Sequence, residues 1–592
     1  MTSAEQDQDM ALNALNVTYD IANTQLELSK QPSKISTYFP SYYKYLRRPE
    51  DTTDALEKQT SSSNITNSRR KEQQLQGKKS RISNHPSNGV LRAHVIKAEC
   101  CLQMAVLQLL QESMMGYLKC GLNLRRAFVS YNYVWQEYQK MGSDHTAFMD
   151  ADTVSGVQFG IGSVHLVLSA LPAKILKAFS FFGWKPDREL GISLLNKCRQ
   201  SQRVRSSMAT ITLLSYYTVA TSFAPQILTD VYSKTCMDIL LQNAQKYHPD
   251  STLNLFFAGR TARQYGFDLP LSTQSFLYAA EISRGEWAEV AVTNACRFEM
   301  ALNHMVTGNW EHAAATFEYL EEQQYWSVAF CRYAQGACYS MIPERRENAI
   351  LCFAQVPQLI NNSRGDKSNS NDHGNRKYYQ QLQHKIKQLG GGLSDINTYI
   401  LRKVTMFQKS GYQNLHFYVP ALEFMCLWNL FPYASPELLV EWLNQHVQTA
   451  LMAIQKCEMK EQEQRLLDLA PNTPLPDYFN ERATLYVIKS SIRNSFPSNQ
   501  QQVLDGDDLL LDINWVVDHK DCISEDTWTV PYALWEAGVI SWSRGNKLKS
   551  KQLWEMALQH RKHDFEYRLA VRLTLCLLLV EESGIATTLM EG

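Results

Sequence analysis

Two places in this sequence of 592 residues gather side chains of the kind that bind metals. His560 and His563 lie three residues apart in the run HRKHD, which puts both on one face of a helix. Two basic residues separate them and a metal would need further ligands, so we interpret the pair as a solvated helix face. Asp505, Asp507 and Asp508 in LDGDDLLLD lack the ligand spacing of a calcium loop. We expect no metal site.

Motifs of the common enzyme classes are also missing. Gly390–Gly392 is not followed by the Gly-Lys-Ser/Thr of a phosphate-binding loop, and the sequence holds neither HExxH nor Gly-x-Ser-x-Gly. His165 stands alone in an apolar run, and we interpret it as a core histidine. We therefore expect no catalytic residue, no cofactor and no enzymatic activity.

The cysteines favour packing over chemistry. None of the 13 lies in a CxxC pair, and Cys331, Cys338 and Cys352 are spaced by seven and fourteen residues, which suits a buried helix face. Free thiols indicate a reducing compartment, so we expect the cytoplasm or the nucleus. The first residues, MTSAEQDQDMALNAL, lack the positively charged start and apolar run of a secretory signal.

The charge balance bears on the class of partner. Lys plus Arg number 59, Asp plus Glu also number 59, and the formal net charge is +0. Domains that bind nucleic acids carry a broad basic surface, so we expect no nucleic-acid partner. The oligomeric state stays open.

The first 90 residues divide into two parts. Residues 1–48 hold an amphipathic helix, with apolar residues at three- and four-residue steps, followed by an aromatic segment. Residues 49–90 are polar and nearly devoid of large apolar side chains, which predicts a disordered linker. A basic cluster in this linker is a nuclear localisation signal, a contact with anionic membranes or, as we favour, a solvated stretch. It comprises Arg69, Arg70, Lys71, Lys78, Lys79 and Arg81.

Residues 91–250 form a predicted helical region with an apolar hairpin at 153–195. Thr153–Ala173 carries no formal charge and is long enough to cross a bilayer. Its glycines, serines and Pro172 suit a membrane span poorly, so we favour a buried helix. A transmembrane segment or a peripheral membrane contact is the alternative. A second helix follows a turn near Gly183.

Residues 251–360 carry a repeat with a period of roughly 34 residues. Each unit has a small residue on its first helix, a glycine and an aromatic residue at the turn, and a small and a large residue on its second helix. Small residues let the helices approach, the glycine relieves backbone strain, and the large residue packs on the next unit. The clearest copy, Arg297–Glu322, has Ala301, Gly308, Trp310, Ala313 and Phe317 at these positions.

Three further copies preserve part of this pattern. They lie upstream of the clearest copy, immediately after it, and at 528–558. Their packing residues are Gly259 and Gly266, then Ala349 and Phe353, then Gly538, Gly545 and Trp554, respectively. The polar run at 361–377 predicts a flexible insert, and residues 378–592 predict a C-terminal helical region.

Alternating strand patterns are scarce, so the fold class that we predict is all-α. It consists of degenerate tetratricopeptide-type helical repeats, forming an α-α superhelix, with an N-terminal helical region. A generic helical bundle is the alternative. Stacked repeats offer a concave surface to partners, which favours a scaffold that binds other proteins.

Most of the sequence resembles one known family. The runs GVQFGIGSVHLVLSALPAKILKAFSFFGWKPDRELGISLL, LNLFFAGRTARQYG and RFEMALNHMVTGNWEHAAATF resemble the tetratricopeptide repeat protein 39 family, which includes the fungal inclusion body clearance proteins. The resemblance implies a non-enzymatic helical protein linked with clearance of inclusions, lipid droplet proteins and lipid homeostasis. It also implies a cytoplasmic or nuclear location or, as the alternative, a peripheral or integral protein of the mitochondrial outer membrane or lipid droplet surface.

Overall fold

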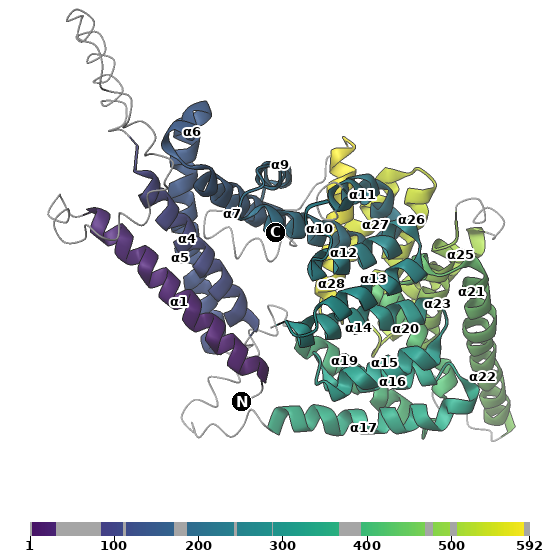
Figure 1. The fold of residues 1–592 in the computed structure, drawn as a ribbon. Helices are drawn as coiled ribbons and strands as arrows, with labels where there is room; N and C mark the ends of the chain where they lie inside the picture. The colour runs from purple at the N-terminus through teal and green to yellow at the C-terminus, as the bar shows by residue number, and fades with distance from the viewer. Residues whose placement is uncertain are drawn as a thin grey trace, which may run out of the picture. The chain divides into compact units, whose positions relative to one another are not determined.

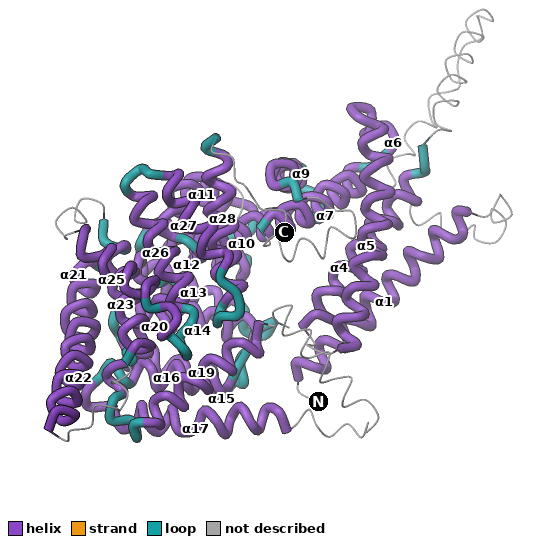
Figure 2. The backbone as a smooth tube through the Cα atoms, turned by 180° about the vertical axis from the view of Figure 1, so that it is seen from behind, coloured by secondary structure: helices purple, strands orange, loops and turns teal. Residues whose placement is uncertain are grey.

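The computed structural model describes residues 3–30, 85–110, 114–170, 186–241, 246–286, 288–365, 392–467, 478–497 and 506–584. Over these ranges the chain forms helices joined by short loops, and no strand occurs among them (Figure 2). The all-α prediction is confirmed. The basic cluster, the turn near Gly183 and residues 366–377 of the predicted insert lie outside the described residues.

The first compact unit comprises Met1–Ser169 and Leu176–Thr210. Its helices are α1 (Ser3–Lys30), α4 (Asn88–Leu110), α5 (Met114–Met141), η2 (Gly142–Asp144), α6 (His145–Phe148), α7 (Ala151–Ser169) and α9 (Arg188–Gln200), and α10 (Ser206–Phe223) begins here. The apolar face of α1 packs against the other helices of this unit. Its residues Leu12, Leu15 and Tyr19 contact a buried cluster around Cys101 and Ala127.

Two glycines bring α7 and α9 into close contact. A methyl group at Gly191 would lie 2.9 Å from the backbone nitrogen of Leu166, and one at Gly162 would lie 3.1 Å from the Gly191 carbonyl oxygen. Asp187 caps α9 by accepting a hydrogen bond from the Leu190 N–H at 2.9 Å. Most of α7 is buried, as the interpretation of a buried helix requires. No helix among the described residues is long and apolar enough to span a membrane.

The second compact unit comprises Ala170–Ile175 and Ile211–Gly592. After α10 and α11 (Pro225–Ile239), the helices pack as successive antiparallel pairs, which Figure 1 shows as layers from α12 down to α17. These helices are α12 (Thr252–Thr261) with the π-helical η4 (Ala262–Gly266), α13 (Leu269–Ile282), α14 (Glu289–Val306), α15 (Trp310–Glu322), α16 (Val328–Tyr339), η5 (Pro343–Arg345) and α17 (Arg346–Gly365).

The remaining helices of this unit do not follow the pairwise order until α26. They are α19 (Gly392–Lys409), η6 (Leu415–Phe417), α20 (Pro420–Trp428), η7 (Phe431–Tyr433), α21 (Pro436–Glu441), η8 (Trp442–Gln448), α22 (Thr449–Leu467), α23 (Phe479–Asn494), α25 (Gly506–Asp518) and η9 (Lys520–Cys522). A final pair, α26 (Thr529–Ser543) and α27 (Lys547–Gln559), precedes α28 (Glu566–Glu582).

Some helices extend beyond the limits expected from the sequence. Helix α4 begins at Asn88, inside the predicted linker 49–90, and α17 continues to Gly365, inside the predicted insert 361–377. A formed helix propagates at little cost through polar residues, so composition places its ends poorly. Asp507 and Asp508, which lack the ligand spacing of a calcium loop, belong to the first turn of α25.

Candidate binding site

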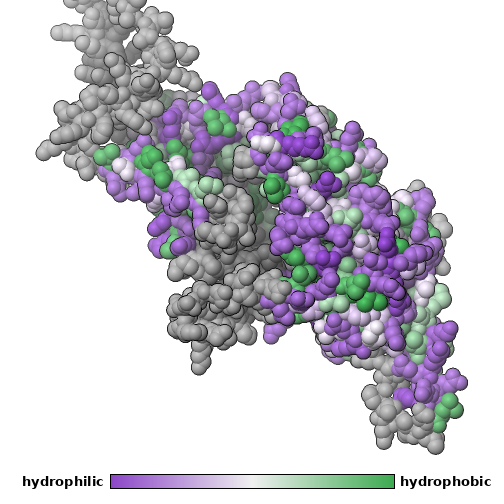
Figure 3. All heavy atoms as spheres, turned by 60° about the horizontal axis from the view of Figure 1, so that its bottom comes forward, coloured by the Kyte–Doolittle hydropathy of each residue, from purple (hydrophilic) through white to green (hydrophobic). Residues whose placement is uncertain are grey.

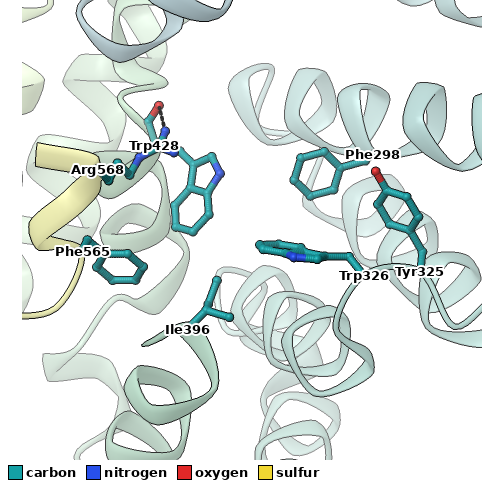
Figure 4. Close-up of a pocket in the computed structure, with 7 residues that line it drawn as sticks. All are labelled: Phe298, Tyr325, Trp326, Ile396, Trp428, Phe565 and Arg568. Atoms are coloured by element: carbon teal, nitrogen blue, oxygen red, sulfur yellow. Dashed lines mark hydrogen bonds between the residues drawn. The ribbon is translucent and has the colours of Figure 1, made fainter. Parts of the chain in front are cut away.

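A pocket of about 420 Å³ in the second unit is lined almost entirely by apolar side chains. The lining residues are Phe298, Tyr325, Trp326, Ile396, Trp428, Phe565 and Arg568. Figure 4 shows Phe298 and Trp326 facing Trp428 across a common space. The volume falls within the ~300–1,000 Å³ usual for ligand pockets. We call this site the Trp326 pocket.

Segments far apart in the sequence supply the walls of the Trp326 pocket. In chain order these are α14, the connection between α15 and α16, α19, the last residue of α20, and the start of α28. Hydrogen bonds fix the connection, because Ser327 Oγ donates to Asn397 Oδ1 at 2.9 Å and accepts from the Phe330 N–H at 3.2 Å. The indole of Trp326 also packs edge-on against Phe330, with ring centroids 4.9 Å apart.

Two bulky lining residues have a left-handed backbone. Trp326 has a φ of 55° and Phe565 a φ of 58°, a region that aromatic residues rarely occupy. Such a conformation costs about 1–3 kcal/mol and persists where the surrounding structure enforces it. Trp326 nevertheless keeps 44% of its surface exposed. Strain that holds an exposed aromatic side chain at a pocket is typical of a binding site.

Arg568 forms the cationic part of the wall. Its guanidinium lies 4.8 Å from the Trp428 ring centroid and 5.2 Å from that of Phe223. Nε donates to the Leu427 carbonyl at 2.9 Å. Nη2 donates to the Trp428 carbonyl at 3.4 Å, the bond that Figure 4 shows as a dashed line. Burial, and then the neighbouring Arg572, lower the pKa of Arg568 to about 10.

A buried charge cluster holds the helices behind the pocket. Lys403 Nζ lies 2.8 Å from Glu423 Oε1 and 2.8 Å from Asp526 Oδ2, and all three side chains are fully buried. The cluster joins α19, α20 and the segment before α26. Burial, and then the carboxylate of Asp526, raise the pKa of Glu423 to about 7 although Lys403 opposes the shift.

Arg402 extends this cluster to the pocket wall. Its Nη2 lies 3.6 Å from Asp526 Oδ1 and 2.5 Å from Asp564 Oδ2. Asp564 immediately precedes Phe565, so the ion pair fixes the start of α28. The ion pair between Arg402 and Asp564 therefore positions Phe565 and Arg568, the two residues at the start of α28 that line the Trp326 pocket.

The predicted packing residues of the repeats lie inside the helical pairs. A methyl group at Gly259 would lie 2.8 Å from the Phe276 ring, and one at Gly538 would lie 2.0 Å from Trp554 Nε1. In both pairs the glycine gives room for an aromatic ring of the second helix. The buried residues at the predicted offsets are Ala301, Trp310, Ala313, Phe317, Ala349, Phe353 and Trp554.

The predicted turn glycines behave in two ways. Gly308 and Gly545 have φ values of 69° and 77°, which only glycine adopts freely, and they form the turns of their pairs. Gly266 has no such backbone. It ends the π-helix η4, and the next residue, Phe267, has the left-handed conformation instead.

Comparison with protein families gives the affiliation. A family model described as Iml2/Tetratricopeptide repeat protein 39 matches residues 47–470, which is more than half of the chain. The chain belongs to this family. No solved structure matches it significantly. The predicted family and the predicted helical-repeat fold are thereby confirmed.

The Iml2/Tetratricopeptide repeat protein 39 match covers one part of the Trp326 pocket. Phe298, Trp326 and Trp428 lie within residues 47–470, whereas Phe565 and Arg568 follow the matched range. The pairs from α12 to α17 lie within it, and the pair α26–α27 lies outside. The pocket thus combines the family region with a later helix.

Sequence reasoning missed the Trp326 pocket. Phe298 and Trp326 are next to or within the predicted repeats, but nothing local links them to Trp428 or Arg568. A usable signal was present in the spacing of Arg568 and Arg572, two cations one helical turn apart on an otherwise apolar segment.

The interpretation of His560 and His563 as a helix face is wrong, because both lie in the connection between α27 and α28, where they meet in a smaller, polar pocket. His560 and His563 line a space of about 210 Å³ together with Lys520, Asp521 and Arg561. Burial lowers the pKa of both imidazoles, and Lys520 lowers that of His560 further.

On the described surface that Figure 3 shows, apolar residues are scattered among polar ones.

Proposed function

We propose that this member of the Iml2/Tetratricopeptide repeat protein 39 family is a non-enzymatic scaffold that holds a segment of another protein in the Trp326 pocket. The observation that carries the proposal is the exposed Trp326 facing Trp428 across an apolar pocket. Aromatic residues in preformed pockets dominate the energetics of protein interfaces. Helical repeats of this class bind extended or helical segments of partners.

A random dodecapeptide library displayed on phage tests the proposal against the full chain. We expect recovered peptides with a large apolar residue, and Trp326→Ala should weaken them at least tenfold, since a central aromatic anchor is worth about 2 kcal/mol or more. Leu351→Ala is the matched control, because Leu351 is also an exposed apolar residue, on α17, outside the pocket. Peptides that bind wild type and Trp326→Ala equally would refute the proposal.

Family membership supports a narrower version of this proposal. The partner would then be a protein of inclusion bodies or lipid droplets, met in the cytoplasm or at the surface of a lipid droplet or mitochondrion. Fluorescently tagged wild type should collect at these structures, and tagged Trp326→Ala should stay dispersed while Leu351→Ala behaves like wild type. Equal distribution of all three would remove the narrower version alone.

A further inference from the structure

The cationic wall of the Trp326 pocket has no acidic partner among the described residues. The nearby carboxylates are engaged elsewhere, because Asp564 pairs with Arg402 and Glu566 lies 3.8 Å from Arg561. Arg572, one turn after Arg568, also has no carboxylate within ion-pair distance in the described chain and donates to the Leu427 carbonyl at 3.1 Å. The carboxyl of Glu536 accepts from Asn494 instead, at 2.6 Å.

The hydrogen-bonding capacity of Arg568 is only partly used. A guanidinium has five N–H donors, and within the described chain Arg568 donates two hydrogen bonds, both to the carbonyls that end α20. The rings of Trp428 and Phe223 lie 4.8 and 5.2 Å from the guanidinium, so among the described residues aromatic side chains and not carboxylates surround this cation. The N–H donors that remain suit a carboxylate, which binds arginine through paired N–H groups.

The interaction with the C-terminus of α20 does not offset the cost of placing the positive charge of Arg568 in this wall. A cation gains only a modest interaction with the dipole at a helix C-terminus, which is less than a charge loses when most of its surface is withdrawn from water, as for the half-buried Arg568. Burial, and then Arg572, lower the pKa of Arg568, which likewise indicates that the surroundings disfavour its positive charge. An anion in the pocket would offset this cost.

We infer that the Trp326 pocket selects an acidic segment of a partner protein, in which an Asp or Glu lies next to an aromatic or long aliphatic residue. The apolar side chain enters between Trp326 and Trp428, and the carboxylate meets Arg568. This inference rests on the proposed function and names the chemistry of its partner. A free fatty acid fits less well, because the pocket is open and part of an acyl chain would stay in water.

The test uses the peptides selected on the full wild-type chain. We expect an Asp or Glu within a few residues of the apolar anchor, and its replacement by Asn or Gln should weaken binding by about tenfold to a hundredfold. Arg568→Gln keeps amide donors for the α20 carbonyls and should cause a loss of the same size. The two changes together should cost little more than either alone, since they remove one interaction.

Two control variants test whether the effect is specific to the positive charge at position 568. Arg568→Lys should keep most of the preference for the acidic peptide, and Arg544→Gln, an exposed arginine after α26, should change nothing. If Arg568→Gln fails to fold, as circular dichroism would show, the peptide substitutions on wild type still decide the matter.

Two results would overturn the inference. Selected peptides without an acidic residue, yet weakened by Trp326→Ala, would leave the proposed scaffold standing and remove its acidic specificity. Oleate binding in the absence of any selected peptide would favour a lipid and refute both.

Discussion

At the scale of single residues, glycine has two functions in these helical pairs. Gly259 and Gly538 leave space for the aromatic rings of Phe276 and Trp554, whereas Gly308 and Gly545 supply a left-handed turn. The first function is steric and the second conformational. Replacement of individual glycines by alanine therefore tests the steric and the conformational function separately.

We predict that Gly538→Ala lowers the free energy of unfolding of the second unit by about 2–3 kcal/mol. The new methyl group would overlap Trp554, whose Nε1 donates to the Trp535 carbonyl at 3.3 Å. Gly266→Ala is the control, because only the Cβ of Asp268 lies within 4 Å and the backbone is not left-handed. Urea denaturation followed by tryptophan fluorescence measures both, and equal midpoints would contradict the steric role.

At the scale of elements, the repeat pairs were predictable and the Trp326 pocket was not. Gly259, Gly308 and Phe317 mark their helices through spacings of a few residues, so the sequence carries the pairs locally. The pocket depends on Lys403 meeting Asp526 and on Arg568 meeting Leu427, contacts that span over a hundred residues. Local periodicity holds no information on which distant helices adjoin.

The buried charge cluster gives the prediction at this scale. Lys403→Met leaves Glu423 buried without its cation and Asp526 with only the more distant Arg402, and we expect a loss of about 3–5 kcal/mol in unfolding free energy. Lys409→Met, on the same helix, should change stability by less than ~1 kcal/mol, since Lys409 is exposed and lies 3.8 Å from Glu525. Thermal melts of both variants decide, and a stable Lys403→Met protein would show that the cluster does not hold α19 to α20.

At the scale of the whole molecule, the same cluster makes stability depend on pH. The pKa of Glu423 is raised to about 7 in the fold by burial and then by Asp526, so the folded chain binds a proton that the unfolded chain has released. Stability from this group is present below pH ~4.5 and is lost as pH rises through about 7. Histidines such as His563, whose pKa burial lowers, act oppositely below pH ~6.5.

We therefore predict a pH-dependent difference between wild type and Glu423→Gln. Between pH 5 and about pH 8 the wild type should lose stability relative to the variant, which carries no titrating group at position 423. Urea midpoints at several pH values measure this difference and cancel the contribution of the histidines. A difference that stays constant over this range would show that Glu423 does not titrate there.

The separation of the pocket walls along the chain also has a consequence during synthesis. Leu427, next to the lining residue Trp428 at the end of α20, and Arg568, which donates to its carbonyl, are 141 residues apart. At about 5–20 residues per second, the ribosome adds the second roughly 7 to 28 seconds after the first. In that interval Trp428 and the neighbouring aromatic side chains lack their cationic cover. We therefore expect the nascent chain to expose an incomplete apolar surface in this interval, and the proposed binding of a partner to require that α28 has emerged.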